Sequence, residues 1–236
     1  MKDLLVVVIG VFGLFHPTEL TVGGAVLRLS ELTTSFRLAS NDFVLRVPGK
    51  IERRYRGNLE VRASGAELVA TVTMDLETAV ASAVAAESPP GASLEALKAQ
   101  AVAARSFYVA GRGRHEGFDF CDTTHCQFLR HPPDQESPAW RAATETRGLV
   151  LHYDGRALAA LYSADCGGRT DAIAGAIARG EGYPYFEVAC PRKGVRRGHG
   201  LGLCQEGATV LARSGAGFQE ILRHYYPNTR LAALIP

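Results

Sequence analysis

The segment DLETAVASAVAAESPPGASLEALKAQAVAAR, Asp75–Arg105, decides the fold, because it reads as a helix, a proline-broken turn and a second helix. In the first helix, Leu76, Val80 and Ala83 fall on one face at helical spacing. Two adjacent prolines follow and end that helix, since proline cannot continue the hydrogen-bond ladder. The pattern predicts a helical pair around which the rest of the chain is organised.

Glu87 stands at the end of the first predicted helix and continues the apolar stripe that begins at Leu76. A carboxyl there is partly desolvated, and the negative end of the helix dipole lies beside it. Both effects favour the protonated form, so we expect a raised pKa, which a general acid requires. The ordinary alternative is a solvated glutamate near a helix end.

The second predicted helix begins after Ser93, a favourable N-cap residue. Lys98 and Arg105, seven residues apart, share one face of it. That face is either an ordinary solvated surface or a cationic wall beside Glu87. Another face carries apolar residues at three-four spacing and is expected to be buried: Leu94, Leu97, Ala101, Ala104 and Tyr108.

Composition indicates a globular protein with an ample core: 236 residues, 47% hydrophobic and 21% charged. A net charge of +2 gives no general electrostatic case for binding nucleic acid, and we expect no nucleic-acid partner. The five cysteines are too few and too sparse for a disulfide framework, which favours metal binding or free thiols.

Residues 1–74 are predicted to form a β-rich N-terminal region. The apolar run at 4–15, LLVVVIGVFGLF, is too short to span a bilayer and suits either a buried first strand or a signal-peptide core, with the strand favoured. Alternating strands follow, separated by turns at Gly23-Gly24, Asn41-Asp42, Pro48-Gly49 and Ser64-Gly65. Residues 75–236 are expected to form one compact catalytic region. The predicted class is α+β, with the β-rich part packed against the helical pair and a mixed β/helix C-terminal part.

His115, Cys121, His125 and Cys126 form the densest group of soft ligands in the chain. Thiolate and imidazole at such short spacing suit zinc. The spacing matches no standard zinc finger, and a Cys121–Cys126 disulfide or two idle thiols remain alternatives.

Two glycine-rich stretches carry the remaining candidate residues. GLVLHYDGRALAALYSA reads as a β-hairpin turned at Asp154-Gly155, and YSADCGGRT (162–170) follows at its end. RGHGLGLCQEGA (197–208) comes later, before a helical GFQEILRHYYP. These stretches are tight turns, substrate-lining loops or, as a third interpretation, a Cys166–His199 nucleophile pair.

Five motifs together resemble the stage II sporulation protein D (SpoIID)/LytB family: LEALKAQAVAARSF at 94–107, CDTTHCQ at 121–127, YSADCGGRT, GHGLGLCQEGA at 198–208 and ILRHYYP at 221–227. The resemblance begins near residue 55 and covers about three-quarters of the chain. It implies a lytic transglycosylase that acts on peptidoglycan glycan strands outside the membrane. A non-catalytic wall-binding protein that modulates a cell-wall amidase is the alternative.

The resemblance also implies roles for individual residues. Glu87, in AESP, matches the family's catalytic acid. Structural zinc matches His115, Cys121 and Cys126, with His125 a further candidate. The substrate-binding residues implied are Lys98, Arg105, Tyr162, Ser163, Cys166, Gly167, His199 and Gln205. Two departures stand out: Ser88 replaces a methionine after the acid, and Cys204 replaces a frequent serine before Gln205.

Overall fold

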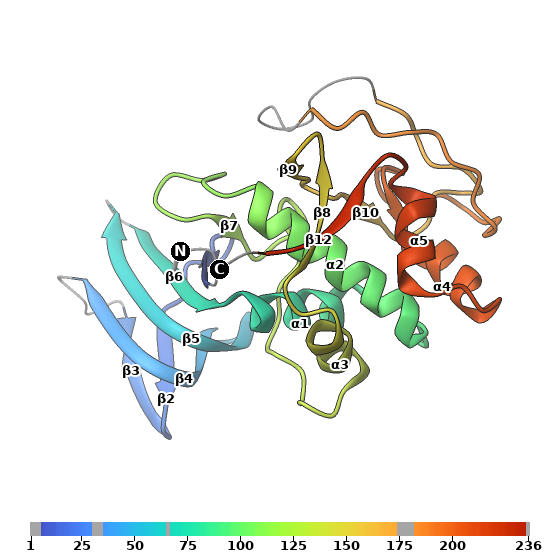
Figure 1. Cartoon of the computed structure of the whole chain (residues 1–236). Coiled ribbons are helices and arrows are strands. Elements are labelled where there is room, and N and C mark those ends of the chain that lie inside the picture. Colours follow the sequence, from blue (N-terminus) through green and yellow to red (C-terminus); the bar gives the residue numbers. More distant parts are fainter. Residues whose placement is uncertain (1–5, 30–34, 65–66, 174–181, 235–236) are drawn as a thin grey trace. The chain divides into compact units, whose positions relative to one another are not determined.

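The computed structural model describes residues 6–29, 35–64, 67–173 and 182–234 (Figure 1). They form an α+β fold, which confirms the predicted class. Contacts divide the chain into unit 1, residues 1–86 and 112–132, and unit 2, residues 87–111 and 133–236. This division differs from the predicted boundary after residue 74. The reason is that the segment 112–132, which follows the second helix of the pair, returns to the β-rich unit.

Unit 1 is built on a seven-stranded sheet with the order β3-β2-β4-β5-β6-β1-β7. All neighbours are antiparallel except β1 and β7, which run parallel. The strands are β1 (Val6–Val11), β2 (Glu19–Val22), β3 (Ala25–Arg28), β4 (Phe36–Val47), β5 (Ile51–Ser64), β6 (Glu67–Asp75) and β7 (Phe120–Cys121).

The apolar N-terminal run forms a strand in the part that the structure describes. β1 pairs with β6 along its whole length, and Val7, Ile9 and Val11 are buried. Its other edge pairs with β7, which recruits the segment after residue 112 into this unit. Among the described residues, no helix combines the length and apolar character needed to cross a membrane.

One predicted turn is wrong. Asn41-Asp42 lies inside β4, where the pairing with β5 shifts register between Ser40 and Asp42. A β-bulge of this kind inserts an extra residue without ending the strand. The Asp42 carboxylate is held by Arg56 and His131, with His131 Nε2 3.1 Å from Asp42 Oδ1.

The other predicted turns have different outcomes. Gly23-Gly24 and Pro48-Gly49 connect paired strands as predicted. The turn at Ser64-Gly65 falls partly outside the described residues.

Unit 2 is organised around α2 (Leu94–Ala110), which packs against α3 (Pro138–Glu145), α4 (Gln205–Arg213) and α5 (Phe218–Tyr225) (Figure 1). It also contacts β8 (Leu149–Tyr153) and β9 (Arg156–Ala157), which form a three-stranded sheet with β12 (Arg230–Ala233). Small side chains on α2, among them Ala99 and Ala103, join the core of this unit.

The predicted helical pair is present. The first helix, α1 (Leu76–Glu87), ends at Glu87 before the two prolines, and Glu87 is the one α1 residue that belongs to unit 2. Ser93 occupies the N-cap of α2, but its hydroxyl makes no capping hydrogen bond. Four members of the predicted apolar stripe are buried, and Leu94 is half-buried: Leu97, Ala101, Ala104 and Tyr108.

The predicted hairpin at 149–157 is confirmed, with β8 and β9 joined at Asp154-Gly155. Both turn residues have positive φ, 48° and 77°, as a type I′ turn requires. The chain then leaves this sheet. The next strand, β10 (Tyr162–Ser163), pairs in parallel with β11 (Leu203–Cys204).

Candidate active site

Glu87 is held by two residues from the glycine-rich loops. Its carboxylate Oε2 accepts a short hydrogen bond from the Tyr162 hydroxyl. Its main-chain oxygen accepts a hydrogen bond of 2.9 Å from Gln205 Nε2. The structure therefore brings two predicted substrate-loop residues to the predicted acid, across sequence separations of 75 and 118 residues.

The pairing of β10 with β11 explains why these loops meet at Glu87. Tyr162 is opposite Leu203, and Gln205 begins α4 two residues later. The preceding Gly202 has φ +64°, and a Cβ there would lie 2.0 Å from the Leu161 carbonyl oxygen. Only glycine permits this approach, so the GHGLG motif fixes the backbone beside the acid.

Tyr162 remains a hydrogen-bond donor over the whole physiological range. Burial, the nearby Glu87 charge and the hydrogen bond to Glu87 raise the pKa of Tyr162 well above its ordinary value. Its phenol therefore keeps its proton and points it at Glu87 Oε2. Sequence reasoning identified Tyr162 as a loop residue, but its contact with the acid depends on the fold.

Ser88, the residue that departs from the family pattern, fastens the turn after the acid. Its Oγ donates to Gln100 Oε1 on α2 at 2.9 Å. Gln100 is buried, and sequence reasoning missed it because a lone glutamine on a helix carries no pattern. The Ser88–Gln100 contact ties the end of α1 to α2 immediately beside Glu87.

Lys98 lies between two carboxylates. Its Nζ is 2.7 Å from Glu95 Oε1 and 2.6 Å from Glu145 Oε2, and 14% of its side chain is exposed. The hydrogen bonds that Lys98 donates to Glu145 and to Glu95, in that order of size, raise the pKa of Lys98. The charge of Lys98 is thus balanced within unit 2. This pairing speaks against a cationic wall on the face of α2 that carries Lys98.

Arg105 is fully buried. Its guanidinium donates to the Ala143 carbonyl at 3.0 Å, the Leu149 carbonyl at 3.1 Å and Thr146 Oγ1 at 3.4 Å. These bonds join α2 to the end of α3 and the start of β8. The side chain thus faces the interior of unit 2, and a direct contact with a ligand would require these bonds to be replaced.

The other loop residues lie in varied surroundings. Ser163 and Cys166 are buried, and the Gly167 amide donates to Asp165 Oδ1 at 2.9 Å. His199 lies at the surface, where surrounding protein atoms lower its pKa by removing part of its hydration. Burial raises the pKa of the Cys166 thiol, which disfavours the thiolate that a cysteine hydrolase needs.

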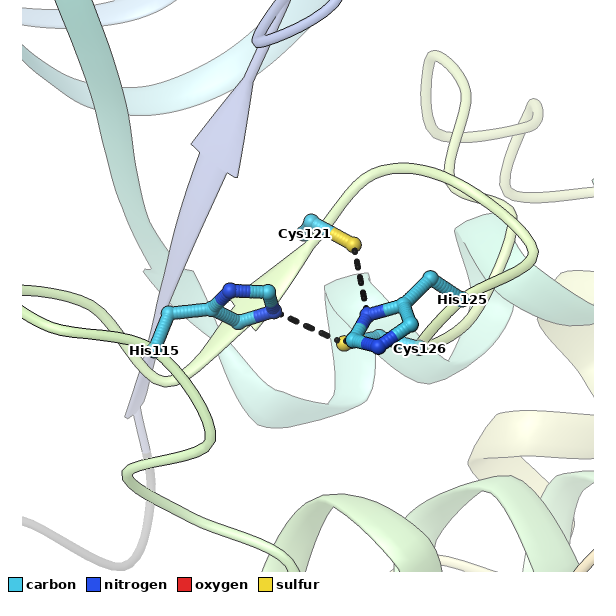
Figure 2. Close-up of side chains that lie close together, drawn as sticks. All are labelled: His115, Cys121, His125 and Cys126. Atoms are coloured by element: carbon cyan, nitrogen blue, oxygen red, sulfur yellow. Dashed lines mark hydrogen bonds between the residues drawn. The ribbon is translucent and has the colours of Figure 1, made fainter.

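The soft-ligand group of unit 1 converges in space. The ligand atoms of His115, Cys121, His125 and Cys126 all lie within 4.8 Å of one another. Figure 2 shows the four side chains directed toward one another, with His115 Nε2 3.2 Å from Cys126 Sγ and His125 Nδ1 3.7 Å from Cys121 Sγ. Two sulfurs and two imidazoles in this arrangement are a donor set that tetrahedral zinc accepts.

Known proteins are similar to the part of the chain that contains Glu87 and the soft-ligand group of unit 1. Residues 64–153 match the family model described as SpoIID, Stage II sporulation protein. This region is similar to the SpoIID family. A protein from Brachyspira hyodysenteriae is 30% identical over 135 residues, 56% of this chain and 36% of that protein. The Amidase enhancer of Bacillus subtilis is 40% identical over 86 residues, 36% of this chain and 12% of that protein.

The family match covers Glu87 and the soft-ligand group of unit 1, but it ends before Tyr162. Tyr162 and Gln205 join the site through their contacts with Glu87, independently of that match. The chain spans about a third of the first relative and about an eighth of the second.

Arg105→Lys tests whether Arg105 acts through structure. A lysine cannot reach three acceptors in a fixed fork, so buried acceptors lose partners. We expect the free energy of unfolding to fall by about 2–4 kcal/mol, measured by urea titration. Arg141→Lys on α3, whose side chain is 62% exposed, is the control and should change stability little. Unchanged stability with lost glycan binding in Arg105→Lys would instead identify a ligand contact.

Proposed function

We propose that this chain is a peptidoglycan lytic transglycosylase that cleaves the MurNAc–GlcNAc bond without water and leaves 1,6-anhydromuramyl products. The observation that carries the proposal is a single carboxyl, Glu87, at a helix end with its side chain and main chain held by Tyr162 and Gln205. The SpoIID family match at this residue supports it.

One carboxyl is sufficient for this reaction. Protonated Glu87 gives its proton to the glycosidic oxygen, which leaves C1 of the muramyl residue as the GlcNAc hydroxyl. The resulting carboxylate then takes the proton from the muramyl C6 hydroxyl as that oxygen bonds to C1. Glu87 ends protonated, and water is not consumed. Ordinary glycosidases, in contrast, need two carboxylates because water must also be activated.

Tyr162 fixes which oxygen of Glu87 does the chemistry. Its hydroxyl occupies Oε2 as a permanent donor, so the proton that Glu87 transfers is carried on Oε1. Gln205 fixes the backbone of Glu87 and thereby limits the positions that the carboxyl can adopt. Tyr162 and Gln205 are therefore positioning residues, and Glu87 is the catalytic residue.

The proposed substrate lies outside the cytoplasmic membrane. The proposal accordingly includes an extracytoplasmic location, in the periplasm or the cell wall, with peptidoglycan glycan strands as the partner.

Glu87→Gln tests the catalytic assignment. The glutamine amide is nearly isosteric, and its oxygen still accepts the hydrogen bond from Tyr162. Its NH2 group is not acidic, so it has no proton to give to the glycosidic oxygen. Release of 1,6-anhydromuramyl products from glycan strands freed of stem peptides should fall by at least about a thousandfold, measured by mass spectrometry.

Glu136→Gln provides the matched control, because Glu136 is an exposed residue before α3. It should release products at the rate of the unaltered chain. Equal activity of Glu87→Gln and Glu136→Gln would remove Glu87 from the mechanism.

Tyr162→Phe tests the positioning role through the pH profile. The phenol donates to the carboxylate and favours its charged form, so without this donor Glu87 holds its proton to higher pH. The pH optimum of kcat/KM should move to higher pH, with a lower maximal rate because the carboxyl is less constrained. Tyr153→Phe is the control, since Tyr153 is half-buried in β8 and its ring packs edge-on against Tyr183. An unchanged optimum in Tyr162→Phe contradicts the role.

A second function has its own support in the relative named Amidase enhancer. In that case the residues around Glu87 bind glycan without cutting it, and the chain modulates a cell-wall amidase. The two functions separate on one measurement: retention on purified sacculi with no soluble product at any pH between 4 and 9, roughly the range in which carboxyls and histidines titrate, favours the second.

We further propose that unit 1 binds structural zinc through His115, Cys121, His125 and Cys126. Two thiolates and two imidazoles fill four positions and leave none for substrate, which is the pattern of a structural site. Such an ion cross-links residues 115–126, the short segment that contains β7 (Figure 2). It supplies folding free energy to that loop and takes no part in the steps assigned to Glu87.

Replacing both unit 1 thiols tests this site. Cys121→Ser/Cys126→Ser should carry about one zinc less per chain than the unaltered protein and should melt at a lower temperature. His125→Ala should keep the ion but bind it at least about tenfold more weakly, because one of four ligands is lost. Equal zinc content in the double variant and the unaltered chain would contradict the proposal.

A further inference from the structure

A second soft-ligand group lies in the core of unit 2, and its three residues fall outside the segment 64–153 that the family model matches. Cys166, Cys190 and Cys204 are 2%, 6% and 0% exposed, and their three sulfurs lie within 4.8 Å of one another. Cys166 and Cys190 lie in the long connection between β10 and β11, and Cys204 is the last residue of β11.

Two backbone amides point at one of these sulfurs. Cys204 Sγ accepts from the amides of Cys166 and Gly207, each at 3.3 Å. A neutral buried thiol needs no such donors, since it packs as a small apolar group. Amide donors directed at sulfur stabilise the thiolate that forms when a metal ion displaces the thiol proton.

The helix geometry adds to the same effect. Cys204 is the N-cap of α4, where the positive end of the helix dipole favours a thiolate. Space at the group is also controlled: a Cβ on Gly207 would lie 2.3 Å from Cys190 Sγ and 2.1 Å from the Tyr225 hydroxyl. The Tyr225 hydroxyl oxygen is 3.2 Å from Cys190 Sγ.

We propose that Cys166, Cys190 and Cys204 form a three-thiolate site for a thiophilic metal ion, Zn²⁺ or Cu⁺. Zn–S bonds of about 2.3 Å place tetrahedral sulfurs about 3.8 Å apart, so the group needs to contract by less than about 1 Å to close on an ion. Zinc takes a fourth ligand, for which the Tyr225 oxygen is adjacent, whereas Cu⁺ is satisfied by thiolates alone.

The site would act on the geometry around Glu87. Cys204 directly precedes Gln205, which holds the Glu87 backbone, and Cys166 follows Tyr162 by four residues. An ion bound by Cys166 and Cys204 would cross-link the segment after β10 to the end of β11, close in sequence to Tyr162 and Gln205. This consequence rests on the proposed role of Glu87, whereas the metal site does not.

The test measures metal directly and does not depend on activity. The full chain carrying Cys121→Ser/Cys126→Ser is purified with reductant after growth in zinc-supplemented or copper-supplemented medium. Elemental analysis should find about one ion per chain, and X-ray absorption should show a first shell with about three sulfurs. Zinc in one preparation and copper in the other would report affinity for both ions, and retention of a single ion in mixed medium identifies the preferred one.

A second variant covers the case in which the first does not fold. Cys190→Ala in the otherwise unaltered chain should lose about one ion while the two-sulfur, two-nitrogen shell of unit 1 remains. Three outcomes overturn the proposal: no ion in Cys121→Ser/Cys126→Ser, no change of ion content in Cys190→Ala, or a mass about 2 Da lower in Cys121→Ser/Cys126→Ser purified without reductant, which identifies a disulfide between two of the three remaining thiols. If the metal is present and Glu87→Gln remains active, the site stands and the proposed function fails.

Discussion

The close approach of Gly202 to the Leu161 carbonyl is the constraint on which the candidate site depends. It allows two strands of only two residues each to pair in parallel, far shorter than parallel strands usually are. Tyr162, in β10, and Gln205, which directly follows β11, then both bond to the same residue, Glu87. A side chain at position 202 would push the loops apart, and both contacts with the acid would be lost together. Gly202 would thus affect the proposed reaction only through the backbone approach that it permits.

Charge placement resolves a conflict that the chemistry of a single acid creates. In the proposed reaction Glu87 has to hold a proton, and a free cation nearby would favour its loss. Lys98 is balanced by Glu95 and Glu145, and the hydrogen bonds of Arg105 go to interior oxygens of unit 2. The contact supplied to Glu87 Oε2 is a neutral phenol donor instead. A phenol orients the carboxyl by a hydrogen bond while adding no charge to the site.

Features governed by local sequence were predictable, and features governed by long-range packing were not. The helical pair, the turn at Asp154-Gly155 and the position of Glu87 at a helix end follow from spacing, proline and glycine. Asn41-Asp42 has turn chemistry, but pairing with β5 on both sides converts it into a bulge. Arg105 has the spacing of a surface cation, yet three acceptors on α3 and β8 draw it inward. Cys190 has no neighbouring motif, because its partners lie 24 residues before it and 14 after it.

The two soft-ligand groups differ in a way that separates their effects. The unit 1 group comes from one short segment, residues 115–126, so an ion there orders a local loop. The unit 2 group spans residues 166–204, and closing long loops removes more chain entropy than closing a short one. Two of its cysteines also flank the residues that hold Glu87, since Cys204 adjoins Gln205 and Cys166 follows Tyr162 in the same loop. Loss of an ion from unit 1 would therefore affect the stability of its own loop, whereas loss from unit 2 would also release the contacts that orient the acid.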